Sequence, residues 1–74
     1  MTKFDVVRAR HAYVAWMHAV DDDMERYAPE HYAHLKATAD AVSEELLRVG
    51  GSRLVTNVIG EAYAVHVGRQ EVAV

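Results

Sequence analysis

The sequence predicts an α+β fold, in which an antiparallel helical hairpin packs on a three-stranded antiparallel β-meander in the order ααβββ. Apolar residues recur at helical spacing through the first two thirds of the chain. A single proline divides this helical region and a glycine pair ends it. The remaining residues are rich in valine and carry two Gly-X pairs, which are typical of hairpin turns. The 74 residues therefore form one small domain, residues 1–74.

The first helix is predicted over residues 3–27. It should end before Pro29, because a proline pushes the preceding residue out of the α region. Aspartates favour helix starts, so a break at the three aspartates of residues 21–23 is the main alternative. The helical stripe that supports this element consists of Val6, Ala9, Tyr13, Trp16, Met17, Val20, Met24 and Tyr27.

The second helix is predicted over residues 29–49, with Pro29 in its first turn, where the missing N–H is harmless. Gly50 and Gly51 supply a left-handed stop. The short connection between the two helices predicts an antiparallel hairpin. The apolar residues of this element follow alternating steps of three and four: Tyr32, Leu35, Ala39, Val42, Leu46 and Val49.

Three strands are predicted over residues 53–59, 62–67 and 70–74. Gly60-Glu61 and Gly68-Arg69 match the two-residue type II′ turn. Folding the chain at both turns gives one continuous apolar face, and a one-residue slip would scatter it. The helical hairpin is expected to cover this face, which carries Leu54, Thr56, Val58, Tyr63, Val65, Val67, Val72 and Val74.

Composition narrows the function classes. The net charge of −3 argues against a nucleic-acid partner, which would have to be attracted by lysine and arginine. No apolar run approaches the roughly 20 residues that cross a bilayer, so no membrane is expected. The absence of cysteine suits a cytoplasmic protein. Arginine outnumbers lysine six to two and alanine and valine dominate, which is typical of a GC-rich genome such as that of an actinobacterium or its phage.

The five histidines raise the question of a metal site. His31 and His34 lie three apart on the second predicted helix, and Asp22 and Glu25 would lie across the helix turn from them. The more specific helical metal motifs are absent, so these residues are interpreted as solvated, with no cofactor expected and a metal-binding protein kept as the alternative. No catalytic constellation appears, so no enzyme activity is expected. A DNA-binding regulator is the remaining alternative, and it would use Arg8 and Arg10 or the flank of the sheet at Arg53 and Arg69.

The outer face of the predicted sheet carries more apolar residues than a solvated face needs. This surplus predicts a protein–protein interaction module. The partner is expected to be a second copy of the chain, in a homodimer or larger assembly, or a host protein modulated by a phage- or mobile-element-encoded accessory protein. The predicted interface residues are Val55, Ile59, Ala62, Ala64, His66 and Ala73.

Overall fold

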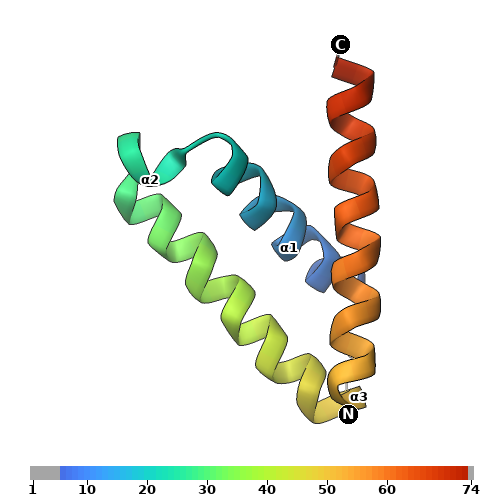
Figure 1. Ribbon diagram of the computed structural model, residues 1–74. Coiled ribbons are helices and arrows are strands. Elements are labelled where there is room, and N and C mark those ends of the chain that lie inside the picture. The colour runs from blue at the N-terminus through green and yellow to red at the C-terminus, as the bar shows by residue number, and fades with distance from the viewer. Residues whose placement is uncertain (1–5, 74) are drawn as a thin grey trace.

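The computed structural model describes the backbone of residues 6–73 and the side chains of residues 6–68. This part of the chain forms three helices and no strand: α1 (Val6–Asp21), α2 (Met24–Tyr27) and α3 (Pro29–Ala73) (Figure 1). Among these helices, none combines the length with the apolar character that crossing a bilayer requires. The fold is therefore all-α over the described residues.

The predicted helix over residues 3–27 is interrupted at the aspartate run, which confirms the alternative interpretation. α1 ends at Asp21, and Asp23 adopts φ 55° and ψ 39°, a left-handed conformation that aspartate tolerates better than most residues. α2 then adds one turn, and Pro29 opens α3 as predicted. The predicted start of the first helix, at residues 3–5, lies outside the described residues.

α3 is divided by a sharp break at Gly51, where φ is 73° and ψ is −171°. The predicted stop at the glycine pair is thus confirmed at Gly51, since this conformation is essentially restricted to glycine. We refer to residues 29–50 as the first arm of α3 and to residues 52–73 as the second arm. Neighbouring Gly50 is tightly packed, because a Cβ there would lie 2.8 Å from Cβ of Leu54.

The predicted strands over residues 53–59, 62–67 and 70–74 are wrong, and with them the α+β fold class, because the second arm is helical. Type II′ turns require a positive φ at their glycine, and Gly51 is the only glycine of the described chain with a positive φ. Gly60 and Gly68 instead occupy helical positions with open space around them. The Gly-X pairs were therefore not turns.

Packing explains why the second arm is helical despite its valine content. Val58 and Ala62 are four residues apart, so they lie on one side of a helix, whereas the predicted sheet would have placed them on opposite faces. Both are fully buried. Burial of one helical line thus prevails over intrinsic strand propensity, which depends strongly on context. That buried line continues in both directions and consists of Leu54, Val58, Ala62 and His66.

α1 lies between the two arms of α3, which diverge from the elbow at Gly51 (Figure 1). The hydroxyl groups of Tyr13 and Ser43 are 2.7 Å apart, and one turn later along α1 the ring of Trp16 lies 4.9 Å from that of Tyr32. From the first of these contacts to the second, residue numbers rise along α1 and fall along the first arm. The two helices are therefore antiparallel, which confirms the predicted hairpin. The opposite side of α1 faces the second arm, where Arg10 forms a 3.3 Å ion pair with Glu61.

The core is small, and alanine contributes much of it. Leu46 and Val58 are the largest fully buried side chains in the described chain. Alanines allow the helices to approach closely but bury little apolar area each. The core cluster consists of Ala9, Tyr13, Val14, Ala39, Leu46, Val58 and Ala62.

Candidate interaction surface and pocket

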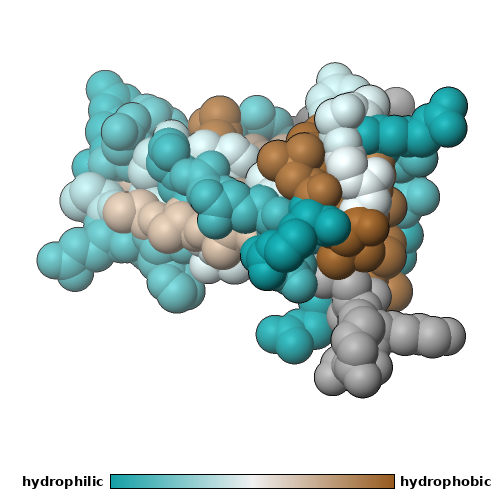
Figure 2. All heavy atoms as spheres, turned by 90° about the horizontal axis from the view of Figure 1, so that it is seen from below, coloured by the Kyte–Doolittle hydropathy of each residue, from teal (hydrophilic) through white to brown (hydrophobic). Residues whose placement is uncertain are grey.

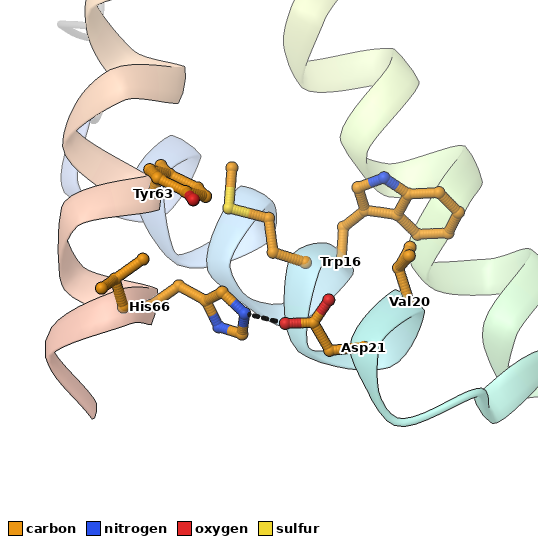
Figure 3. A pocket seen from close by; sticks show the side chains of 7 residues that line it. Trp16, Val20, Asp21, Tyr63 and His66 are labelled. Carbon is orange, nitrogen blue, oxygen red and sulfur yellow. Dashed lines mark hydrogen bonds and ion pairs between the residues drawn. The ribbon is translucent and has the colours of Figure 1, made fainter. Parts of the chain in front are cut away.

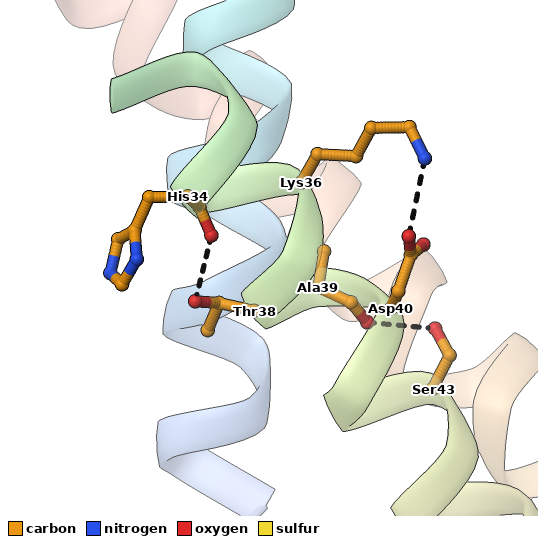
Figure 4. A network of polar contacts seen from close by, with 6 residues as sticks. All are labelled: His34, Lys36, Thr38, Ala39, Asp40 and Ser43. Carbon is orange, nitrogen blue, oxygen red and sulfur yellow. Dashed lines mark hydrogen bonds and ion pairs between the residues drawn. The ribbon is translucent and has the colours of Figure 1, made fainter. Parts of the chain in front are cut away.

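The two arms of α3 present different surfaces. The first arm carries charged residues along its length, including a 3.2 Å pair between Lys36 and Asp40. Its hydroxyl side chains bond back to the helix, as Thr38 donates to the carbonyl of His34 and Ser43 donates to that of Ala39 (Figure 4). This side of the molecule therefore satisfies its polar groups and is typical of a solvated helix surface.

The outward side of the second arm has no charged residue between Arg53 and Glu61, and Glu61 is paired with Arg10. In the view from below, apolar residues gather around the elbow and the second arm, and hydrophilic residues cover most of the opposite end (Figure 2). We define the second-arm face as these exposed residues of the second arm: Thr56, Ile59, Gly60, Tyr63 and Ala64.

The second-arm face combines large and small residues in adjacent rows. Ile59 and Tyr63 are four apart and are 37% and 61% exposed, so they form one ridge. Gly60 and Ala64, also four apart, form a shallow row beside it. Charge depletion and exposed aromatic and aliphatic groups are typical of the core of a protein–protein interface.

A pocket of about 300 Å³ lies between the end of α1 and the second arm (Figure 3). Trp16 and Tyr63 stand on opposite sides of it, and Asp21 and His66 close its lower end in this view. The complete lining comprises Trp16, Met17, Val20, Asp21, Tyr63, His66 and Val67. The lining therefore combines five apolar or aromatic side chains with the polar pair of Asp21 and His66 at one end.

His66 and Asp21 join the end of α1 to the second arm. Nε2 of His66 lies 2.6 Å from Oδ2 of Asp21, so the imidazole N–H donates to the carboxylate. The His66 side chain is only 5% exposed, whereas that of Asp21 is 52% exposed and reaches the pocket. The rings of His18 and His66 are nearly perpendicular, with 6.3 Å between their centroids. A buried imidazole thus holds a carboxylate that solvent and ligands can reach.

The predicted interface residues do not lie together on one surface. Ile59 and Ala64 are exposed on the second-arm face, and Val55 is half-buried. Ala62 and His66 are buried against α1, and the side chain of Ala73 lies outside the described residues. The outward sheet face on which this set was based does not exist, so only Ile59 and Ala64 remain available to a partner.

The candidate metal residues remain on the surface. His31 and His34 are exposed near the start of the first arm, and Glu25 is exposed on α2. Asp22 accepts a hydrogen bond from the Tyr27 hydroxyl, which closes the connection between α1 and α2. No three histidine or carboxylate side chains of the described chain come together as metal ligands. Of the candidate cations for nucleic acid, Arg8 is exposed on α1 and Arg10 forms an ion pair with Glu61.

Sequence reasoning missed the pocket. The predicted register places Tyr63 under the helices and His66 on the outer sheet face, so it puts the two residues on opposite sides of the sheet. The available signal was the four-residue spacing from Val58 through Ala62 to His66, which on a helix points the imidazole toward α1. The chain matches no protein-family model, no curated protein and no solved structure. Over its described residues the chain is a three-helix protein whose second arm carries no charged residue between Arg53 and Glu61.

Proposed function

We propose that this protein is a small non-enzymatic interaction module that self-associates through the second-arm face. The observation that carries this proposal is the exposed ridge of Ile59 and Tyr63 on a helix surface without charge. Scattered apolar residues are normal on a protein surface, but an uncharged row on a helix that already buries its opposite side is not needed for folding.

The small core supports an assembly. A 74-residue chain buries only about 60% of its unfolded surface, so its stability is marginal. No cysteine is available to cross-link it, and its largest fully buried side chains are Leu46 and Val58. Covering Ile59 and Tyr63 in a second copy would add apolar burial at about 25 cal/mol per Å². Self-association would therefore stabilise the fold as well as the complex.

The arrangement of the second-arm face favours a second copy over an unrelated protein. A two-fold symmetric dimer requires a surface that is complementary to itself. The ridge of Ile59 and Tyr63 lies beside the shallow row of Gly60 and Ala64, so each copy can seat its ridge in the row of the other. Such packing of rows spaced four residues apart is common between helices in globular proteins.

Two lysine substitutions test this proposal with a matched control. Ala64→Lys places a charge at the centre of the second-arm face, while Ala37→Lys makes the same change at an exposed alanine of the charged first arm. Molar mass would be measured by size exclusion with light scattering over a range of micromolar concentrations. We expect about twice the 8.3 kDa chain mass for the unchanged protein and for Ala37→Lys, and a dissociated chain for Ala64→Lys.

A monomeric unchanged protein at every concentration would refute self-association. Unfolding of Ala64→Lys, seen as loss of the helical circular dichroism signal, would show instead that this position is core. A second variant, Ile59→Lys, separates these outcomes, because Ile59 belongs to the ridge and Ala64 to the shallow row. A cytoplasmic host protein, modulated by a phage-encoded accessory protein, is the alternative partner for the same face.

A further inference from the structure

We infer that α3 can straighten at Gly51 into one continuous helix, and that two straightened copies exchange their second arms. The partner is a second copy of the chain, which meets the first through the buried side of the second arm instead of the exposed second-arm face. The exchange therefore does not depend on the proposed function. Short hinges under strain favour such an exchange, and here a single residue, Gly51, joins the two arms.

The bent form requires glycine at both positions of the elbow, and a straight helix requires it at neither. Gly51 has a φ of 73°, which residues with a Cβ rarely adopt. At Gly50 a Cβ would lie 2.8 Å from Cβ of Leu54, whereas residues four apart on a regular helix keep these atoms about 5–6 Å apart. Alanine at either position should therefore disfavour the bend and favour the continuous helix, in which glycine is the poorer residue.

The polar contacts that hold the second arm in place can form equally well between two copies. Arg10 pairs with Glu61 at 3.3 Å, and Nε2 of His66 lies 2.6 Å from Oδ2 of Asp21. Each contact joins α1 to the second arm, and neither needs the two helices to belong to one chain. An exchanged pair would form each contact twice, so the main difference between the two forms lies in the conformation of the elbow.

The buried residues of the two arms fit a continuous helix that contacts two copies of α1. The largest fully buried side chain is Leu46 on the first arm and Val58 on the second arm. They are 12 residues apart, which corresponds to a rotation of about 120° around a regular helix, so they would lie on different sides of a straight α3. One side would keep the chain's own α1, and the other would receive α1 of the second copy.

An exposed leucine beside the elbow supports the involvement of a second copy. Leu47 is 51% exposed in the bent form. On a continuous helix it would lie about two turns before Leu54 and about three turns before Val58, and therefore on the same side as both. The buried line of the second arm would thus extend back to Leu47. The second copy would cover a large apolar side chain that the bent form leaves in solvent.

Molar mass in the Ala64→Lys chain tests the exchange, because this background removes association through the second-arm face. With the unchanged elbow we expect the 8.3 kDa chain mass at micromolar concentrations. Gly51→Ala should raise the dimerisation constant at least about a hundredfold and double the mass, since in each copy it strains the bend and favours the straight helix. Gly68→Ala makes the same change inside the second arm, which is helical in both forms, and should leave the mass unchanged.

Ser52→Pro is the opposite perturbation. Ser52 is the first helical residue after the break, where proline is tolerated, but a proline inside a continuous helix disrupts it. In the same Ala64→Lys background, this variant should keep its helical circular dichroism signal. It should also stay monomeric at every concentration, including those at which the unchanged elbow begins to pair.

A distance within one chain distinguishes the exchange from other dimers. The chain has no cysteine, so Ala33→Cys and Val65→Cys, both at exposed positions, would provide two unique sites for spin labels. A continuous helix would separate these sites by about 48 Å, whereas the longest principal dimension of the bent chain is 37 Å. Doubly labelled Gly51→Ala chains, diluted with unlabelled ones, should show the long distance.

A Gly51→Ala dimer that keeps the short distance would consist of bent copies and would overturn the exchange. So would a Gly51→Ala chain that stays monomeric, or an equal rise in mass for Gly68→Ala. Should Gly51→Ala not fold, Gly50→Ala opposes the same bend through Leu54 and should give the same dimer and the same long distance. At concentrations too low for pairing, Gly51→Ala leaves only the strain of the bend, which lowers the stability of the single chain.

Discussion

Replacement of Gly60 by alanine is expected to stabilise the protein, because this residue lies within a helix. Glycine in a helix interior is less favourable than alanine by about 0.5–1 kcal/mol. Beyond the adjacent residues and the backbone of the same helix, no atom of the described chain lies within 4 Å of the position that the new Cβ would occupy, so no steric penalty opposes the gain. Gly68 has the same surroundings. The two sites are about 12 Å apart along the helix, so their effects should add to about 1–2 kcal/mol.

Thermal melting by circular dichroism would measure this gain. A change of 1 kcal/mol moves the melting temperature of a domain this size by about 4–8 °C, so Gly60→Ala should raise it by about 2–8 °C. The double variant with Gly68→Ala should raise it by about twice as much. The measurement belongs in the Ala64→Lys background, since Gly60 lies on the second-arm face and a new methyl group there could alter self-association.

The same substitutions distinguish the helix from a hairpin. In a type II′ turn the first central residue requires a positive φ, so alanine there would lower stability by about 1 kcal/mol or more. A fall in melting temperature in either single variant would therefore refute the helical second arm. Retention of the helical signal with a higher melting temperature in both would exclude the turns.

Three further changes address the elbow, the core and the connection before α3. Gly51→Ala should lower stability by about 1–3 kcal/mol, because φ 73° and ψ −171° strain any residue with a Cβ; an unchanged melting temperature would mean that the break lies elsewhere. Leu46→Ala should lower the unfolding free energy by about 2–5 kcal/mol in urea denaturation, because the side chain is fully buried; a loss below about 1 kcal/mol would contradict that burial. The hydrogen bond to Asp22 raises the pKa of Tyr27 above its ordinary value of 10.0, so the folded chain holds the phenol proton more tightly than the unfolded chain does. The resulting stabilisation is present below pH 10.0 and is lost as the pH rises through the raised pKa. Absorbance titration should show Tyr27 titrating late in the folded chain, and Asp22→Asn should return its pKa toward the ordinary value.

The parts of the fold that were predictable from sequence were those where one residue type has a single physical consequence. Pro29 opens α3 because it cannot continue a preceding helix, and Gly51 breaks α3 because its conformation excludes a Cβ. Asp23 takes the left-handed position at the aspartate run. The pocket was not predictable, because it requires Trp16 and Tyr63 to lie on opposite sides of one space between two helices, and their relative position depends on the course of the second arm.

The second arm was misread for the same reason that its outer face is a candidate interface. A helix is recognised in sequence by an apolar line alternating with a polar surface. Here Val58 and Ala62 supply the buried line, but Ile59 and Tyr63 make the outward side apolar as well, so the helical period is masked. When both sides of a segment are apolar, the sequence pattern does not separate a helix from a strand. The valine content and the Gly-X pairs then favour strands. The absence of charge between Arg53 and Glu61 is thus both a source of the wrong period and the physical basis of the proposed contact between copies.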